Sequence, residues 1–173
     1  MTAQPYVIVG AGAIGGTIAH ALIRAGHHVT LVDTDAAHVA ALRADGLTIL
    51  RDDGPTPVED TVAVPAAHTP DEAPRDEAFS AAIVAVKSQH TADAAAWLAD
   101  GRLAADGYAV SLQNGANEPV LASALGEARV IGAFVDIFAD WERPGVIRYG
   151  GPGALAVGIP GTGVPDARVL RTA

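Results

Sequence analysis

The sequence predicts an α/β fold in which helices cover both faces of a mostly parallel sheet, with an antiparallel β extension toward the C-terminal end. Apolar runs alternate with helix-period segments up to about residue 127, which is typical of parallel strands joined by helices. Beyond that point the helical pattern stops, and short apolar runs are separated by Gly and Pro. Half of the 173 residues are hydrophobic and 18% are charged, which is enough for one well-buried domain.

The first strand-to-helix turn carries the most informative motif. An apolar strand over 5–10 leads into Gly10-x-Gly12-x-x-Gly15 and then into a helical pattern over 14–25. In such a turn the first glycine permits a tight bend, the second lets the backbone approach a pyrophosphate, and the third lets the helix pack closely. Because the helix N-terminus also offers free N–H groups and a positive dipole end, this unit predicts a Rossmann-type dinucleotide site.

The second strand ends in an acid. An apolar run over 28–33 closes on Asp33, which lies 18 residues after Gly15. A carboxylate at this place can bind both hydroxyls of an adenosine ribose. It can also cap the helix expected over 35–44, for which Thr34 is a candidate N-cap, and capping is compatible with ribose binding.

Residues 46–80 interrupt the alternation of strands and helices. Short β-like pieces lie over 47–50 and 58–64, and a Pro-rich acidic stretch follows over 70–77. This composition predicts an insertion made of a hairpin and a surface loop.

Two further strands, over 81–86 and 108–113, are each followed by a polar residue. Lys87 follows the first strand, and Asn114 follows the second. Because the carboxyl ends of parallel strands share one edge, we expect both side chains in the crevice beside the glycine turn. Alternatively, Lys87 is a solvated strand-end charge and Asn114 a turn residue. The helices after these strands are expected over 90–99 and 118–125, the second with Asn117 as its N-cap.

The C-terminal part is predicted to be β-rich. A fifth strand of the main sheet is expected over 129–135, and the whole region divides into three short strands joined by Gly/Pro turns. A Pro- and Gly-rich stretch over 160–165 resembles a linker. The three short strands are expected over 130–138, 145–149 and 154–159.

Composition excludes several classes of function. The formal net charge of −9 argues against a nucleic-acid partner, whose backbone requires a basic surface. No apolar run approaches the ~20 residues of a membrane span, so we expect no membrane partner. The absence of cysteine fits a cytoplasmic protein, and the six histidines lack metal-binding spacing, so no metal site is expected.

Three spaced motifs resemble the N-terminal dinucleotide-binding domain of ketopantoate reductases, which are 2-dehydropantoate 2-reductases. They are Gly-Ala-Gly-Ala-Ile-Gly-Gly at 10–16, Val-Lys-Ser-Gln-His-Thr at 86–91 and Leu-Gln-Asn-Gly at 112–115. Val-Ile-Gly at 130–132 and Arg-Pro-Gly-Val-Ile at 143–147 continue the likeness, which covers about residues 5–160. The glycine turn is shared by many dehydrogenases, but the spaced trio is more specific.

The resemblance implies an activity and a set of site residues. Family members reduce a 2-keto acid to a 2-hydroxy acid with hydride from a nicotinamide cofactor, in the cytoplasmic pathway of pantothenate biosynthesis. By this likeness Lys87 lies beside the cofactor, and Asn114 contacts the nicotinamide ribose and the substrate. The residues that would bind the pyrophosphate are Gly10, Ala11, Gly12, Ala13, Ile14 and Gly15.

Two departures from the family pattern shape the expectation. The family's proton-donating lysine belongs to a helical C-terminal domain without a counterpart here, so we assign 1–160 to the dinucleotide-binding domain and 161–173 to a linker or the start of that domain. The domain would then act in cis or in trans, and a homodimer stays open. A carboxylate at Asp33 repels a 2′-phosphate, which favours NAD with NADP as the runner-up. The alternative is a stand-alone NAD-binding sensor or partner module without catalysis.

Overall fold

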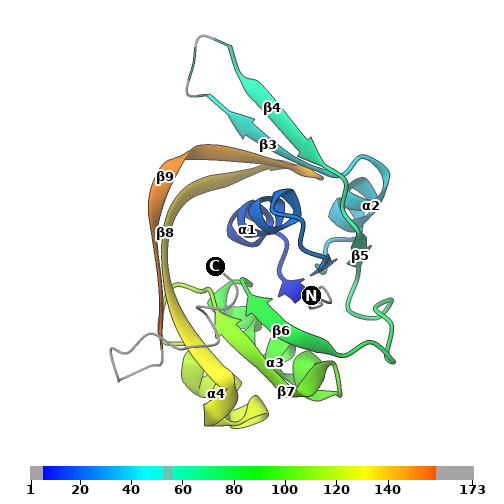
Figure 1. Ribbon diagram of the computed structural model, residues 1–173, viewed down its shortest axis with the longest axis vertical. Coiled ribbons are helices and arrows are strands. Elements are labelled where there is room, and N and C mark those ends of the chain that lie inside the picture. Colours follow the sequence, from blue (N-terminus) through cyan, green and yellow to red (C-terminus); the bar gives the residue numbers. More distant parts are fainter. Residues whose placement is uncertain (1–5, 53, 55, 159–173) are drawn as a thin grey trace.

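The computed structural model describes residues 6–52, 54 and 56–158, and Figure 1 shows the arrangement of their helices and strands. The predicted linker at 160–165 and the segment 161–173 lie outside the described residues. The helices are α1 (Ala13–Arg24), α2 (Ala36–Ala44), α3 (Thr91–Ala99) and α4 (Glu118–Leu125), with short 3-10 turns η1 (Ser88–His90) and η2 (Glu127–Arg129). The strands are β1 (Tyr6–Val9), β2 (Val29–Val32), β3 (Leu47–Arg51), β4 (Val58–Val62), β5 (Ala66–His68), β6 (Phe79–Val84), β7 (Leu103–Ser111), β8 (Val130–Arg143) and β9 (Val146–Gly158).

All nine described strands belong to one mixed sheet, in the order β4-β3-β9-β8-β7-β6-β1-β2-β5. The run from β8 through β7, β6, β1 and β2 to β5 is parallel, as the alternation of strands and helices predicts. The pairs β3–β4 and β8–β9 are antiparallel hairpins. The predicted fold class, a parallel sheet with an antiparallel extension, is therefore confirmed.

Helices cover both faces of the sheet, and the central strand shows why. Side chains alternate along β1, so Tyr6 and Ile8 face one way while Val7 and Val9 face the other. The first pair belongs to a buried cluster that includes residues of α1 and α2, and the second pair to a cluster with residues of α3 and α4. An uninterrupted apolar strand buried on both faces is what a central parallel strand requires.

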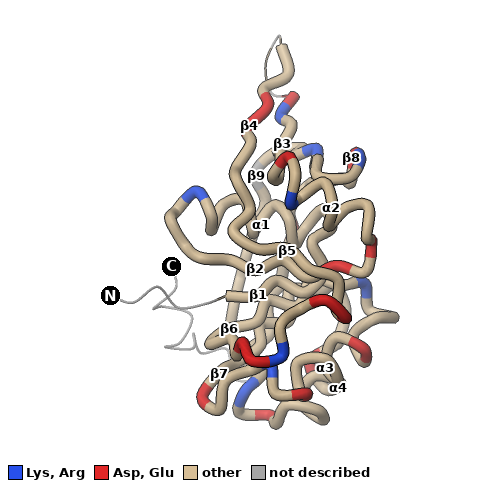
Figure 2. The backbone as a smooth tube through the Cα atoms, turned by 90° about the vertical axis from the view of Figure 1, so that its right-hand side faces the viewer, with Lys and Arg blue, Asp and Glu red and all other residues tan. Residues whose placement is uncertain are grey.

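The sheet curls around α1, so that this helix lies in a hollow between the β8–β9 hairpin and the strands β1 and β6 (Figure 1). Parallel pairing of Thr48 in β3 with Val146 in β9 extends the curl to the β3–β4 hairpin. Gly16 makes this close approach possible, because a Cβ atom at that position would overlap the side chain of Ile147. In the view of Figure 2 the β3–β4 hairpin projects at one end of the molecule, and α3 and α4 lie at the other.

The C-terminal region differs from the prediction of three short strands. Within the described residues, the two segments expected over 145–149 and 154–159 form one strand, β9 (Val146–Gly158), which is paired with β8. The glycines between them permit irregular pairing instead of a turn, since a Cβ atom at Gly153 would overlap the carbonyl oxygen of Asp136. Register shifts near Phe138 record the same irregularity.

Two smaller predictions also need correction. Asp35, not Thr34, is the N-cap of α2, and its carboxylate accepts hydrogen bonds from the amides of Ala37 and His38. Strand β5 was not predicted, because three residues beside Pro65 leave almost no apolar pattern. The hairpin predicted within 46–80 is confirmed as β3–β4.

The described residues form the helices α1 to α4 and the 3-10 turns η1 and η2. None of these helices combines the length and the apolar character that crossing a bilayer requires.

Candidate functional site

The carboxyl ends of the central parallel strands are level with one another. Val9 at the end of β1 pairs with Val32 on one side and Val84 on the other. Backbone hydrogen bonds continue past the strand ends, from the Gly10 amide to the Val32 carbonyl at 2.8 Å and from the Ala85 amide to the Val9 carbonyl at 2.9 Å. The segments that follow these strands therefore meet at one edge of the sheet.

The glycine turn at this edge is sterically constrained at two positions and open at one. Gly10 has a φ of +94°, and a Cβ atom there would lie 2.8 Å from the amide nitrogen of Val86. A Cβ atom at Gly15 would overlap the carbonyl oxygen of Gly10. At Gly12 a Cβ atom would meet nothing within 4 Å, so this part of the backbone faces open space. The turn thus has room for a ligand at the place where the motif predicts a pyrophosphate.

The first turn of α1 also suits an anion. Gly12 is the N-cap and makes no side-chain capping bond, and the first-turn amides of a helix have no intrahelical acceptor. These amides, with the positive end of the helix dipole, can bind a phosphate group. The formal net charge of −9 does not favour an anion, but salt screens charges more than about 10 Å away, so nearby donors matter most for binding.

The backbone amide and the backbone carbonyl of Ala11 both form hydrogen bonds with side chains from the segment after β2. Its amide donates to Oδ2 of Asp33 at 2.8 Å, and its carbonyl lies 2.9 Å from Nε2 of His38. The other carboxylate oxygen of Asp33 accepts the Asp35 amide at 2.9 Å. Asp33 therefore organises the glycine turn and, being only half-buried, also presents its carboxylate to the crevice.

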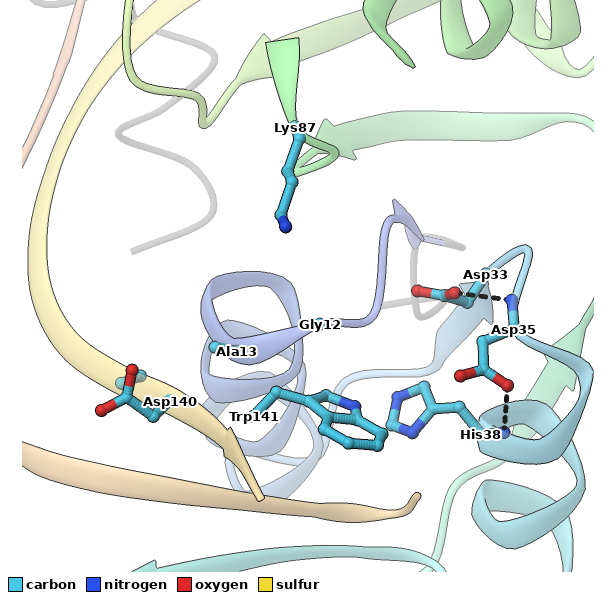
Figure 3. Close-up of a pocket in the computed structure, with 9 residues that line it drawn as sticks. Gly12, Ala13, Asp33, Asp35, His38, Lys87, Asp140 and Trp141 are labelled. Atoms are coloured by element: carbon cyan, nitrogen blue, oxygen red, sulfur yellow. Dashed lines mark hydrogen bonds between the residues drawn. The ribbon is translucent and has the colours of Figure 1, made fainter. Parts of the chain in front are cut away.

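A cavity of about 440 Å³, here called the acidic pocket, opens beside the glycine turn. Figure 3 shows Lys87 pointing toward Gly12 from one side, with Asp33 to the right and Trp141 on the opposite side. The residues that line the acidic pocket are Gly12, Ala13, Asp33, Asp35, His38, Lys87, Ala139, Asp140 and Trp141.

A second cavity of about 330 Å³, here called the Asn114 pocket, lies at the ends of β6 and β7. Lys87 belongs to both linings, so the two pockets are neighbours. The residues predicted at the strand ends are thus distributed over adjoining pockets. Asp33 and the glycine turn border the acidic pocket, Asn114 borders the Asn114 pocket, and Lys87 borders both. The Asn114 pocket is lined by Ile14, Ala85, Val86, Lys87, Ser88, Gln89, Leu112, Gln113, Asn114 and Val135.

A polar network beneath the Asn114 pocket was missed by sequence reasoning. The buried Gln113 amide donates to the Val86 carbonyl and to Oγ1 of Thr91, both at 2.8 Å. Thr91 in turn donates to Oδ1 of Asn117 at 3.3 Å, and the Asn117 amide donates to the Asn114 carbonyl at 3.0 Å. The only sequence signal was the density of amide side chains after β7.

Asn117 therefore has a different function from the one predicted. It occupies the N-cap position of α4, as expected, but its side chain makes no capping bond. It binds loop carbonyls and the Ser88 hydroxyl instead. This arrangement ties the turn after β6 to the turn after β7, and so fixes the backbone that carries Lys87 and Asn114.

A third cavity, here called the back pocket, has a volume of about 410 Å³ and lies beside the C-terminal half of α1. His20 lies in its wall, with Nε2 3.0 Å from the Asp60 carbonyl, and burial lowers the pKa of this histidine below its usual range. Asp60 also pairs with Arg24 at 3.0 Å. The back pocket has none of the predicted site residues in its lining.

Within residues 6–52, 54 and 56–158, no group of three or more His, Cys, Asp or Glu side chains is arranged to hold a metal ion.

Comparison with known proteins identifies similar sequences and structures. A family model described as ketopantoate reductase PanE/ApbA matches residues 6–161. A 2-dehydropantoate 2-reductase of Halobacterium salinarum is 32% identical over 168 residues, which is 96% of this chain and 52% of the relative. One of Pyrococcus abyssi is 35% identical over 155 residues, 88% of this chain and 46% of the relative.

Solved structures agree with these sequence matches. A PanE/ApbA family ketopantoate reductase from Ralstonia eutropha superposes with a TM-score of 0.77 at 32% identity, over 89% of this chain and 49% of that protein. The chain spans about half the length of each of these relatives.

Proposed function

The chain belongs to the ketopantoate reductase PanE/ApbA family, and from this premise we propose that it is the cofactor-binding half of a nicotinamide-dependent 2-keto acid reductase. The substrate is 2-dehydropantoate or a similar 2-keto acid. The observation that carries the proposal is the glycine turn, which is open at Gly12 and sterically closed at Gly15, at an edge shared with Asp33 and Lys87.

The residues present fit a dinucleotide. The diphosphate would bind at the first turn of α1, along the segment from Gly10 to Gly15, and the adenosine ribose beside Asp33. The nicotinamide would then lie in the Asn114 pocket, with Lys87 between the two ends of the cofactor. When bound, the cofactor supplies the hydride.

The charges of the acidic pocket favour NAD over NADP. Asp33, Asp35 and Asp140 line it, against a single cationic side chain among the described lining residues, Lys87. An ester phosphate on the adenosine ribose would add about two negative charges to this surface. A free 2′-hydroxyl, by contrast, can donate to the Asp33 carboxylate.

Asn114 is proposed to orient the nicotinamide ribose and the keto acid. Its carbonyl accepts bonds from Ser88 at 3.1 Å and from Asn117 at 3.0 Å, so the backbone is fixed while the side chain is exposed at the pocket. Orientation of the two reactants accounts for much of the rate in such a reaction. The proton for the resulting alkoxide would come from a helical C-terminal domain, in cis or in trans.

Nucleotide titration tests the cofactor half of the proposal. We expect the chain to bind NADH with one site per chain, and more tightly than NADPH, when the fluorescence of the bound nucleotide is measured. A folded chain, as judged by circular dichroism, that binds neither nucleotide would overturn the proposal.

Turnover tests the catalytic half. We expect no NADH oxidation with 2-dehydropantoate by the chain alone, and measurable oxidation once the chain is joined to the C-terminal half of the Halobacterium salinarum relative. Turnover by residues 1–173 alone would show that the chain holds its own proton donor, contrary to the proposal.

A further inference from the structure

The β8–β9 hairpin reaches across the molecule to the glycine turn. Its tip, residues 139–145, contributes one side of the acidic pocket through Ala139, Asp140 and Trp141. The tip is joined to the turn through one side chain, His38, whose ring accepts the Gly145 amide at 3.0 Å across a sequence separation of 107 residues. The Trp141 ring lies edge-on to the same imidazole, with 6.4 Å between ring centroids (Figure 3).

The two hydrogen bonds of His38 define which ring nitrogen donates and which accepts. The Gly145 amide can only donate, so Nδ1 is an acceptor and carries no hydrogen. The Ala11 carbonyl can only accept, so Nε2 carries the hydrogen and donates at 2.9 Å. The buried ring thus takes the tautomer with its hydrogen on Nε2, and each ring nitrogen has a different partner. The ring bridges the glycine turn and the hairpin tip.

The hairpin is also anchored nearer its middle. Ile147 packs on Gly16 of α1, where a larger residue would not fit. Trp141 pairs with Ile147 across the hairpin, so the anchor and the tryptophan share one position along the strands. Closer to the tip, the hydrogen bond from the Gly145 amide to the His38 ring joins the hairpin to α2. The Gly145 carbonyl also accepts the Thr48 amide at 2.9 Å, so loss of the His38 bond would loosen the tip on the α2 side while β3 still holds Gly145.

Trp141 is the large apolar side chain in the lining of the acidic pocket. It is 47% exposed, although its ring faces the buried His38. A ligand between Lys87 and Trp141 would bury part of this aromatic surface, which favours binding. Without the tip, the glycine turn would border an open groove and not a pocket with two walls.

We infer that His38 is a positioning residue for the dinucleotide: it holds the hairpin tip, with Trp141, against the glycine turn as the second wall of the acidic pocket. The inference rests on the proposed cofactor site and assigns a function there to a strand hairpin that lies more than 100 residues from the glycine motif. Trp141 contacts the bound nucleotide, and His38 acts through the Ala11 carbonyl and the Gly145 amide.

Paired substitutions separate the two bonds. The amide nitrogen of a glutamine can reproduce the donation by Nε2, and the amide oxygen of an asparagine can reproduce the acceptance by Nδ1. We therefore expect His38→Gln to loosen the contact between the hairpin tip and α2, and His38→Asn to retain it. The affinity for NADH, measured by nucleotide fluorescence, should fall by roughly tenfold in His38→Gln, the upper range for one hydrogen bond, and less in His38→Asn.

Trp141 itself reports the position of the tip. The chain has two tryptophans, so Trp97→Phe leaves Trp141 as the single fluorophore. In that background we expect His38→Gln to shift the Trp141 emission to longer wavelength and to increase its quenching by acrylamide, before any nucleotide is added. His20→Gln, which changes another buried histidine in the back pocket, is the matched control and should leave Trp141 emission unchanged.

The outcomes distinguish this inference from the proposed function. If the chain binds no dinucleotide but the Trp141 emission responds to His38→Gln, the cofactor proposal is wrong, while the link through His38 between the glycine turn and the hairpin tip is supported. If both emission and NADH affinity equal those of the parent, the positioning inference is overturned. Should the His38 variants unfold, Trp141→Leu tests the same inference, because Trp141 is exposed and its replacement leaves no cavity in the core. Unchanged NADH affinity in that variant would show that Trp141 does not contact the bound nucleotide.

Discussion

The two sides of the crevice are stabilised in different ways. On the β2 side, the peptide of Ala11 is held by two separate side chains, Asp33 at its amide and His38 at its carbonyl. On the β7 side, Gln113, Thr91 and Asn117 form one connected network that binds several backbone carbonyls. The first arrangement depends on single contacts, and the second distributes its contacts over a group.

This difference follows from burial and chemistry. The β7-side network is largely buried, so its amides and hydroxyl must satisfy one another, and removal of one leaves another without a partner. The carboxylate of Asp33 is half-buried and can exchange a protein partner for water or ligand. We therefore expect changes on the β7 side to lower stability, and changes on the β2 side to alter ligand preference.

The glycine turn between the two sides gives the largest expected effect. In Gly15→Ala the new methyl group would overlap the Gly10 carbonyl, which is backbone and cannot rotate away. We expect a loss of about 3 kcal/mol in the free energy of unfolding, at the upper end of overpacking costs, together with loss of NADH binding. Urea unfolding and nucleotide titration measure the two effects.

Gly12→Ala is the matched control for that substitution. Its methyl group would enter open space, so stability should fall by no more than about 1 kcal/mol, the difference between glycine and alanine at a helix N-cap. NADH affinity should still fall, because the methyl group occupies the path of the diphosphate. Equal destabilisation by the two alanines would show that the turn is not constrained as described.

The β7 side can be tested with Thr91→Val. The substitution keeps the shape of the side chain but removes the hydroxyl that joins Gln113 to Asn117. We expect unfolding free energy to fall by about 2 kcal/mol, the cost of buried groups left unpaired, with a smaller change in NADH affinity. Ser88→Ala, at an exposed position of the same network, should cost less in the same urea experiment.

Asp33→Asn tests the β2 side. Loss of the carboxylate charge should improve NADPH binding relative to NADH, and we expect the ratio of the two dissociation constants to shift by on the order of tenfold. Asp140→Asn removes a charge from the same pocket but touches no glycine-turn amide, so its shift should be smaller. A ratio that stays constant in Asp33→Asn would remove the basis for NAD preference.

The back pocket provides the smallest effect and lies away from both sides. Because burial lowers the pKa of His20, the unfolded chain binds a proton more readily than the folded chain. This contribution to stability is present above the unfolded value of about 6.5 and is lost as pH falls through the folded pKa. Thermal unfolding at neutral and mildly acidic pH should show a smaller pH dependence in His20→Gln, and identical profiles would contradict this origin.

Much of the fold could be predicted because its signals are local. The strand, glycine turn and helix at 5–25 follow from hydrophobic periodicity and from three glycines, and the structure places β1 and α1 there within about two residues. The same reasoning found the strand ends at Asp33, Lys87 and Asn114. It failed where local signals conflict with pairing: the glycines near 150 indicate turns, but β8 pairs through them.

The candidate site shows the same division. The residue types at strand ends predicted which side chains border the crevice, but not which of them bind one another. Thr34 and Asp35 are both good N-caps in sequence, and the helix geometry selects Asp35. Gln113 was included in the strand expected over 108–113 and Thr91 in the helix expected over 90–99, so neither was identified as a residue that follows a strand.

The amino-acid sequence by itself determined the parallel α/β unit, the glycine turn and the polar residues Asp33 and Lys87 near strand ends, because each of these signals lies in a short stretch of the chain. Only the tertiary structure decided that His38 and Gly145 meet and that Trp141 borders the acidic pocket. Those contacts depend on how far the sheet curls around α1, and that curl is set by packing among β3, β8 and β9 that no local pattern encodes.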